Sequence, residues 1–258
     1  MKSSLVSSIN HDLRTPLSAI KGYTDLLLDG AYGALSAEQG EATQAIASAT
    51  QRMIEIVNAL LDLRKLEKGR STLAVGPLDL KQLVSEICAE MSPLAKAKGL
   101  ILTKKVSQGS FPMTSDKRSL CRILSNLVGN AIKFTERGGV QVSVDSVAAS
   151  LRGPGNMVQI RVEDTGCGIE ARHLERVFDP FYQVDPFGNN ATHGNGLGLA
   201  ICKQLVKLLK GRIKVESKVG RGTAFTTVLP QHADWTTGLS EPRERERAIF
   251  PGERRATK

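Results

Sequence analysis

The chain has 258 residues, of which 41% are hydrophobic and 24% are charged, a composition typical of a globular protein with two modest domains. Its apolar runs are far shorter than the ~20 residues that cross a bilayer, and the Met1 region lacks a signal-peptide pattern, so a cytoplasmic segment without membrane contact is predicted. The net charge of +9 comes from dispersed basic residues with only 4% aromatic residues, which argues against a nucleic-acid-binding protein.

Two amphipathic helices are predicted at the N-terminus. The first is predicted over residues 5–29. Its apolar positions, with Thr24 as the one polar member, recur every three or four residues: Leu5, Ile9, Leu13, Leu17, Ile20, Thr24 and Leu27. Residues 30–33 break this helix, and Ser36 with Gln39 forms a capping box that begins a second helix over 36–68. Its apolar seam consists of Ile46, Ala49, Met53, Ile56, Leu60 and Leu63.

A helical hairpin of this kind buries one stripe on each helix, and two helices cannot enclose a core. Pairing two hairpins into a four-helix bundle solves this problem, so a homodimer is predicted. The alternative is that the hairpin packs against its own C-terminal domain.

From residue 71 the pattern changes to mixed α/β, after turns at residues 69–71 and 76–77. Helices are expected over 79–98, 116–134 and 197–209, and strands over 100–106, 140–147, 157–163, 213–217 and 223–229. This order favours a two-layer α/β sandwich. The predicted domains are therefore residues 1–70 and 71–230, followed by a disordered tail, 231–258, with alternating Arg and Glu.

His11 lies on the face of the first helix opposite its apolar stripe and should project into solvent. Pro16 should kink the helix beside it. Asp12 can accept the Nδ1–H of His11, which leaves Nε2 as a nucleophile, and Thr15 shares the face of His11, where its hydroxyl could orient a water.

The segment from His11 to Pro16 resembles the phosphoacceptor box of sensor histidine kinases, His-Asp/Glu-x-x-Thr/Asn-Pro on the first helix of a dimerising hairpin. The resemblance implies that His11 is the acceptor, Asp12 the general base, and Thr15 the residue that supports dephosphorylation of the partner.

A polar stripe lies on the helix predicted over 116–134. Asn126, Asn130 and Lys133 are spaced by four and three residues, so they share one face. Asparagine is a poor helix former, which indicates a use beyond helix stability. An amide oxygen suits Mg²⁺, and Lys133 can meet a phosphate.

A carboxylate and two glycines follow the strand predicted over 157–163. Asp164 can accept the exocyclic amine of adenine, whereas guanine carries an oxygen there, so ATP is favoured over GTP. Gly166 and Gly168 permit close approach of a flat ligand.

A further glycine run, Gly194, Gly196 and Gly198, follows a polar segment that we expect to be a mobile lid and begins a helix whose N–H groups attract phosphates. A dinucleotide fingerprint is rejected because the run falls late in the chain without a suitably placed acidic residue.

The segment Phe178-Asp179-Pro180-Phe181 lies on the other side of the polar segment from the glycine run. Together these segments resemble the N, G1, F and G2 boxes of the Bergerat-type ATP-binding fold, which is shared by histidine kinases, DNA gyrase, a heat-shock chaperone and a mismatch-repair protein. The resemblance covers residues 5–230. It implies that Asn130 is the principal Mg²⁺ ligand, that Asn126 and Lys133 support the phosphates, and that Asp164 reads adenine. Thr223 then supports the adenine end. Leu5, where the family often has Phe, and Asn195, where it often has Thr, are small departures.

An ATP-dependent protein-histidine kinase of a two-component system uses every one of these motifs. It would pass the phosphoryl group to a response regulator receiver domain. A Bergerat-fold ATPase leaves the His11 motif unexplained, and such ATPases carry a glutamate base at the position of Asn126. A catalytically silent ATP-binding scaffold is the third alternative. A sensing module is expected before the first helix, and it could anchor the parent protein to a membrane.

Overall fold

A computed structural model describes residues 2–69, 72–106, 111–147, 156–184 and 194–232, with side chains described from Leu13 onward. The chain forms two compact units. One comprises Met1–Ser71 with Asp179–Ile201, and the other comprises Thr72–Phe178 with Cys202–Lys258. Within the described residues, every helix lacks the long apolar stretch that a membrane span requires.

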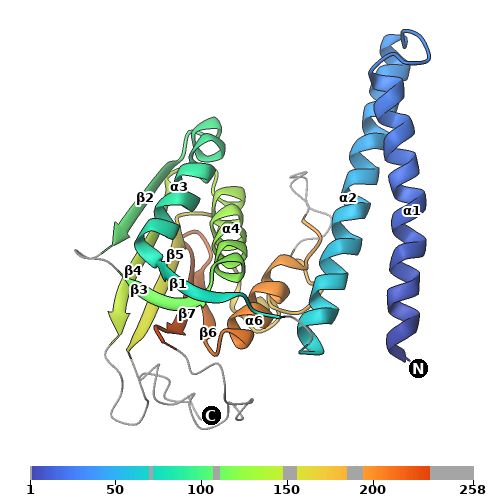
Figure 1. Ribbon diagram of the computed structural model, residues 1–258. Coiled ribbons are helices and arrows are strands. Elements are labelled where there is room, and N and C mark those ends of the chain that lie inside the picture. The colour runs from blue at the N-terminus through green and yellow to red at the C-terminus, as the bar shows by residue number, and fades with distance from the viewer. Residues whose placement is uncertain (1, 70–71, 107–110, 148–155, 185–193, 233–258) are drawn as a thin grey trace. The chain divides into compact units, whose positions relative to one another are not determined.

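The N-terminal unit is built on an antiparallel helical hairpin of α1 (Lys2–Leu28) and α2 (Ala37–Glu67), as Figure 1 shows. The predicted capping box is present: the Ser36 hydroxyl accepts the Gln39 N–H at 3.2 Å, and the Gln39 side chain accepts the Ser36 N–H at 2.9 Å. Because this box satisfies backbone donors at both positions, it fixes where α2 begins. Pro16 lies inside α1, as expected.

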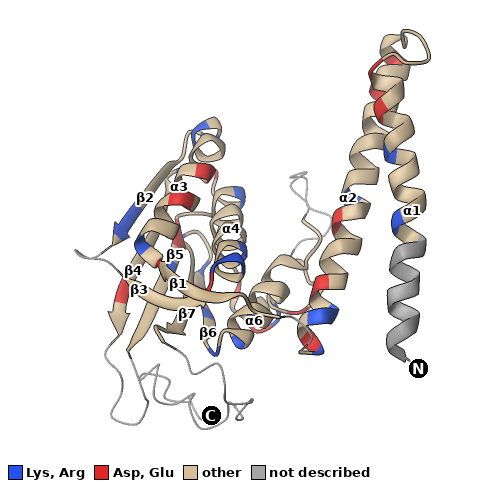
Figure 2. Ribbon diagram, viewed as in Figure 1, with Lys and Arg blue, Asp and Glu red and all other residues tan. Residues whose placement is uncertain are grey.

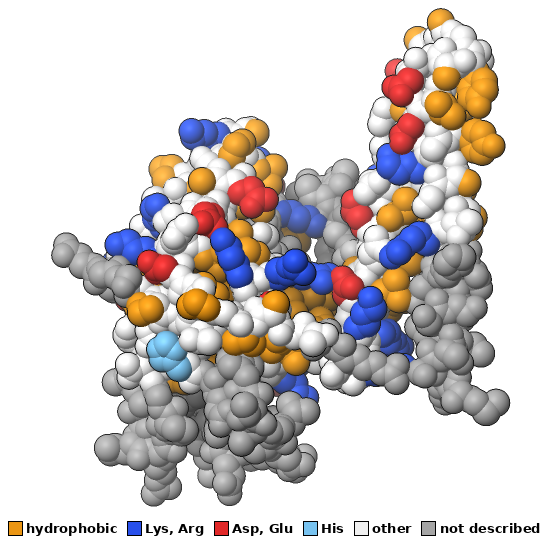
Figure 3. All heavy atoms as spheres, in the orientation of Figure 1, with side chains coloured by type: hydrophobic (Ala, Val, Ile, Leu, Met, Phe, Trp, Pro, Cys, Tyr) orange, Lys and Arg blue, Asp and Glu red, His pale blue; other side chains and the backbone are white. Residues whose placement is uncertain are grey.

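Threonine residues contribute to the hairpin's own seam. The buried residues of the hairpin are Leu17, Thr24, Thr43, Thr50 and Leu63. Each threonine hydroxyl donates to a carbonyl of its preceding turn, for example Thr43 to Gln39 at 2.7 Å. These three buried hydroxyls are therefore all hydrogen-bonded. Most of the predicted apolar seam is left exposed instead, including Leu13, Ile20, Ile46, Met53 and Ile56. Figure 3 shows apolar side chains on the outer surface of the hairpin.

The second unit is a two-layer α/β sandwich, as predicted. Its five-stranded sheet has the order β2-β4-β5-β7-β6, in which β2 and β4 are parallel and the other neighbours antiparallel. The strands are β2 (Ile101–Val106), β4 (Gly139–Val147), β5 (Met157–Asp164), β6 (Arg212–Lys218) and β7 (Gly222–Pro230). Helices α3 (Leu80–Ala97) and α4 (Lys117–Phe134) cover one face (Figure 1), and α6 (Gly198–Leu208) precedes β6.

The two faces of the sheet differ in character. Alternate residues of β4 and β5, such as Val142 and Val162, are buried on the face covered by α3 and α4, together with Phe225 of β7. On the opposite face, Arg161 pairs with Glu216 at 2.9 Å and with Glu163 at 3.4 Å. Figure 2 shows charges of both signs interspersed over this unit. The core therefore lies between the sheet and its helices.

Three short elements were not predicted: β1 (Val75–Asp79), β3 (Pro112–Asp116) and α5 (Ala171–Leu174). The pair 76–77, expected to form a turn, lies within β1, which pairs antiparallel with β3. This two-stranded sheet tolerates Pro77 because an edge strand need not donate every backbone N–H. A sequence pattern that treats proline as a breaker misses such a strand.

The structure describes two residues after β7, Gln231 and His232. Gln231 donates its N–H to the Asn156 carbonyl at 2.9 Å, and His232 Nδ1 lies 3.2 Å from the Thr114 hydroxyl. The rest of the predicted disordered tail lies outside the described residues.

Candidate active site

The His11 motif lies on α1. The structure describes only the backbone of His11 and Asp12, and this backbone is helical. Thr15 is exposed one turn later, whereas Leu17 is buried, so the Thr15 side faces away from the hairpin seam. Arg14 donates to the Asn58 side chain of α2 at 2.7 Å and ties the two helices together next to this motif.

Helix α4 begins with a buried cap. The Asp116 carboxylate accepts the Ser119 N–H at 2.8 Å and the Ala74 N–H at 3.1 Å, so it binds both the start of α4 and the residue just before β1. The helix then buries one long apolar face against the sheet: Leu120, Ile123, Leu124, Leu127, Val128, Ala131 and Ile132.

The predicted polar stripe lies beside that apolar face. Asn126, Asn130 and Lys133 are all half-buried. Burial lowers the pKa of Lys133, whose ammonium lies 4.9 Å from the centre of the Phe134 ring. A partly desolvated cation of this kind gains from a neighbouring anion, which fits a phosphate-binding role.

Asp164 ends β5 and is only 6% exposed. Its Oδ1 accepts two backbone N–H groups, from Gly166 at 2.8 Å and from Thr223 at 3.2 Å. Burial raises the pKa of Asp164, and the two N–H donors oppose that shift. Since both bonds use Oδ1, the second carboxylate oxygen is available to accept from a ligand.

Glycines make the surroundings of Asp164 possible. A Cβ on Gly166 would overlap the Phe134 carbonyl oxygen at the end of α4, and one on Gly168 would overlap the Lys218 carbonyl oxygen at the end of β6. A Cβ on Gly222 would overlap the backbone of Asp164 itself. The loop after β5 therefore fits against α4 and the β6–β7 hairpin only with glycine at these positions.

The structure thus brings Asp164, Gly166, Gly168 and Thr223 together, with the Lys133 end of α4 adjoining Gly166. Asn126 and Asn130 share a helix with Lys133.

The last glycine run belongs to the other unit, where its carbonyl groups accept hydrogen bonds. Phe181 donates its N–H to the Gly196 carbonyl at 2.9 Å, and the Gln183 side chain donates to the Gly194 carbonyl at 2.7 Å. Asn195 accepts the Leu197 N–H at 3.1 Å, just before α6 begins at Gly198. Residues 185–193 of the expected lid lie outside the described residues.

Two residues that support this site were not predicted from the sequence. Lys98 donates to the carbonyl oxygens of Ile132, Lys133 and Thr135 at the end of α4. Ser217 contacts the Thr223 hydroxyl at 2.9 Å. A small hydroxyl residue in a strand just before a glycine-rich turn was the only sequence signal for Ser217.

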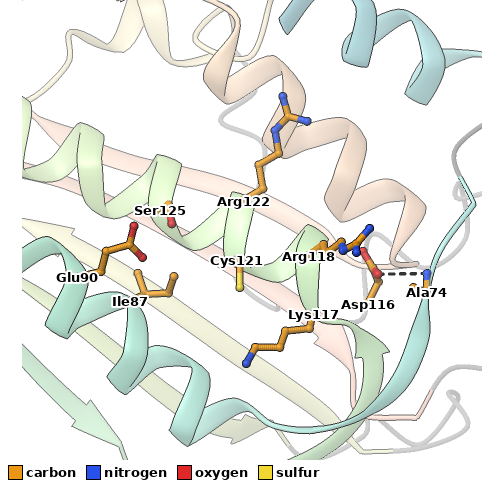
Figure 4. A pocket seen from close by; sticks show the side chains of 9 residues that line it. All are labelled: Ala74, Ile87, Glu90, Asp116, Lys117, Arg118, Cys121, Arg122 and Ser125. Carbon is orange, nitrogen blue, oxygen red and sulfur yellow. Dashed lines mark hydrogen bonds between the residues drawn. The ribbon is translucent and has the colours of Figure 1, made fainter. Parts of the chain in front are cut away.

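A separate open groove lies between α3 and α4 (Figure 4). It is lined by Ala74, Ile87, Glu90, Asp116, Lys117, Arg118, Cys121, Arg122 and Ser125. None of the predicted nucleotide-binding residues lines this groove. Among the described residues, no group of three His, Cys, Asp or Glu side chains could hold a metal ion.

Comparison with known proteins gives two family matches. Residues 1–69 match the His Kinase A (phospho-acceptor) domain, and residues 115–233 match the histidine kinase-, DNA gyrase B- and HSP90-like ATPase family. The second match contains the nucleotide-binding residues that the sequence predicts.

Relatives extend over both regions. An uncharacterised sensor-like histidine kinase of Rhizobium meliloti is 36% identical over 90% of this chain and 43% of its own length. The circadian input-output histidine kinase CikA of Synechococcus elongatus is 34% identical over 89% of this chain and 30% of its own length. The chain therefore spans less than half the length of these relatives.

Solved structures agree with this assignment. Full-length ShkA in complex with AMPPNP superposes with a TM-score of 0.76 at 30% identity, over 88% of this chain and 45% of ShkA. The histidine kinase AdeS of Acinetobacter baumannii shares the fold, with a TM-score of 0.60 at 22% identity over 86% of this chain and 98% of AdeS. The chain therefore carries the phospho-acceptor and ATPase domains of a histidine kinase catalytic core, in that order.

Proposed function

We propose that this chain is the core of an ATP-dependent protein-histidine kinase of a two-component system, with a phosphoacceptor domain over residues 1–70 and an ATP-binding domain over 71–230. The observation that carries the proposal is the Asp164 carboxylate, which is buried and held by two backbone N–H groups on one oxygen. A fixed, desolvated acceptor of this kind suits the exocyclic amine of adenine.

The phosphates of ATP would extend from Asp164 toward the polar face of α4. Lys133 lies where α4 meets the Gly166 loop, and Asn126 and Asn130 precede it on the same helix face. In this assignment Lys133 and Asn126 bind phosphate oxygens. The resemblance of the glycine run to the last glycine box is the sole basis for assigning backbone N–H groups of Gly194, Gly196 and Gly198 to the phosphates as well.

The donor set fits Mg²⁺ better than a tightly chelated metal. Without a carboxylate or histidine cluster among the described residues, the ion would be held by the Asn130 amide oxygen together with phosphate oxygens and water, which is the coordination Mg²⁺ prefers. When bound, the ion would neutralise charge on the phosphates.

The acceptor is the imidazole of His11. Its Nε2 attacks the γ-phosphorus of ATP, an N–P bond forms, and the bond to the ADP oxygen breaks. Asp12 accepts the Nδ1–H of His11 and stabilises the cation formed on attack. The phosphoryl group then passes to an aspartate of a response regulator receiver domain.

A homodimer is the proposed assembly. The hairpin seam uses Leu17 and several threonines, so the predicted apolar seam around Ile46, Met53 and Ile56 has no partner within the described hairpin. Burying it in a four-helix bundle with a second hairpin removes apolar surface from water.

Incubation with γ-labelled ATP tests the function. We expect an acid-labile, base-stable label on the wild-type protein and none on His11→Gln, which should retain ATP binding. Phosphate release without a protein label would instead identify an ATPase, and ATP binding with neither result would identify a silent scaffold. A label that persists unchanged in His11→Gln would exclude His11 as the acceptor.

A further inference from the structure

The hydroxyl of Ser217, on β6, joins three segments around Asp164. Ser217 Oγ accepts the Ile169 N–H at 2.8 Å, contacts the Gly222 carbonyl oxygen at 2.8 Å and lies 2.9 Å from the Thr223 hydroxyl. It thus connects the end of the glycine loop after β5 with the start of β7. All of these contacts are half-buried.

The proton count of this group is constrained. A serine hydroxyl carries one proton and two lone pairs. The Gly222 carbonyl oxygen can only accept a hydrogen bond, so the Ser217 hydroxyl donates to it. The Ile169 N–H donates to one lone pair of Ser217 Oγ. The remaining lone pair is satisfied when Thr223 donates. In this arrangement the Thr223 proton points to Ser217, and Thr223 Oγ1 offers a ligand lone pairs alone.

The strand register places these groups on one face of the sheet. Ser217 pairs with Thr223, and Val162 pairs with Phe225, so the two-residue alternation puts Asp164 and Thr223 on the same face as Ser217. The Thr223 N–H donates to Asp164 Oδ1, which leaves the other carboxylate oxygen and Thr223 Oγ1 as neighbouring acceptors.

We propose that Ser217 is a specificity-determining positioning residue. By accepting the hydrogen bond of the Thr223 hydroxyl, it makes the adenine end of the site a surface of hydrogen-bond acceptors. This inference rests on the proposed ATP-binding function. Such a surface accepts the 6-amino group of adenine and disfavours the 6-oxo group of hypoxanthine or guanine, because two acceptors would then face a third. Ser217 itself touches no nucleotide and acts through Thr223.

Nucleotide discrimination in the whole 258-residue chain tests the proposal. Dissociation constants for ADP and inosine diphosphate, measured by calorimetry, give a ratio for each variant. These two ligands have the same phosphates and ribose and differ only in the base. In Ser217→Ala the freed Thr223 hydroxyl can turn and donate to the 6-oxo group, so the preference for ADP should fall about tenfold. Ser217→Thr, which keeps a hydroxyl, should restore it.

Two further variants make the result decisive. Ser143→Ala removes a half-buried strand hydroxyl elsewhere on the sheet and should leave the ratio unchanged. If Ser217→Ala does not fold, Ser217→Cys serves in its place, since a thiol of similar size is a weak hydrogen-bonding group and should also lose discrimination.

The outcomes separate the possible roles of Ser217. Equal weakening of both ligands at an unchanged ratio, or no weakening at all, would reduce Ser217 to a structural residue and overturn the proposal. A wild-type chain that binds neither ligand would overturn the proposed ATP-binding function itself. A wild-type chain that binds both equally would remove Asp164 and Thr223 from base recognition, and this inference with them.

Discussion

The ammonium group of Lys98 lies 2.8 Å from the backbone carbonyl oxygen of Lys133, and it donates to the carbonyls of Ile132 and Thr135 as well. The last carbonyls of a helix lack partners within the helix and carry its negative dipole end. Lys98, at the end of α3, therefore caps α4 at the point where α4 meets the Gly166 loop.

Lys98→Met should destabilise the end of α4. Losing the charged donor leaves its carbonyls without this partner, so we expect the free energy of unfolding to fall by about 1–2 kcal/mol, measured by urea denaturation. Lys96→Met is the matched control, because Lys96 is an exposed lysine in the last turn of the same helix. An equal loss in both variants would mean that net charge, and not the cap, is responsible.

Gly222 and Gly220 offer a paired test of the contact with Asp164. Both have positive φ, +97° and +74°, but only at Gly222 would a Cβ overlap the Asp164 backbone, whereas a Cβ on Gly220 meets nothing within 4 Å. Gly220→Ala should cost ~1–2 kcal/mol through its backbone conformation alone. Gly222→Ala should cost about 2 kcal/mol more and weaken ADP binding. Similar unfolding energies and ADP affinities for the two variants would show that β7 can move away from Asp164 freely.

Much of the fold was predictable because the local signals agree with the tertiary structure. The capping box at Ser36 fixes the start of α2, and the alternation in β4 and β5 fixes which residues face the helices. The strands β1 and β3 escaped prediction because they are short and contain Pro77 and Pro112, which are tolerated at an edge or at a first strand position.

The candidate site was predictable only in part. Asp164 and Asn130 belong to short motifs whose chemistry can be inferred from residue type and spacing. Lys98 reaches carbonyls about 35 positions away in the chain, and Ser217 acts through a strand pairing. The Lys98 contact has no local sequence signal, and that of Ser217 is limited to its place before a glycine-rich turn, because each contact depends on how distant segments pack.

Asp164→Asn should separate binding from stability. Burial raises the pKa of Asp164, so its charged form is disfavoured in the folded state. That stability contribution is fully present below the unfolded pKa and is lost as the pH rises through the folded pKa. At neutral pH, Asp164→Asn should therefore be at least as stable as the wild type in urea denaturation, while ADP binding is severely weakened. A large loss of stability would mean that the charge is needed for folding.

The raised pKa of Asp164 also predicts the pH dependence of base recognition. Adenine requires the ionised carboxylate as acceptor, so affinity should fall as the pH decreases through this pKa, which burial raises above the ordinary value of an aspartate. Adenosine is the suitable probe, because it has no phosphates that titrate. Asp164→Asn should bind adenosine weakly at every pH. If the affinity falls at low pH for ADP but not for adenosine, the titrating groups are the phosphates.

The final prediction concerns the reverse reaction, in which phosphate is removed from the partner regulator. Thr15 is exposed on α1, one helical turn beyond His11, and it precedes Pro16 within the helix. A hydroxyl at this position can hold an attacking water beside a docked aspartyl-phosphate, whereas transfer from ATP requires only the imidazole and Asp12.

Thr15→Ala should therefore spare autophosphorylation and lose most of the phosphatase activity. With a cognate phosphorylated regulator and ADP present, the wild-type chain should accelerate phosphate loss, and the alanine variant should do so far less. Thr15→Ser, which keeps the hydroxyl, should retain the activity. Both rates are measured on one protein preparation, with label incorporation from γ-labelled ATP as the measure of kinase activity. If kinase and phosphatase activities fall together in Thr15→Ala, Thr15 supports the helix next to Pro16, since loss of helix geometry would misplace His11 in both reactions.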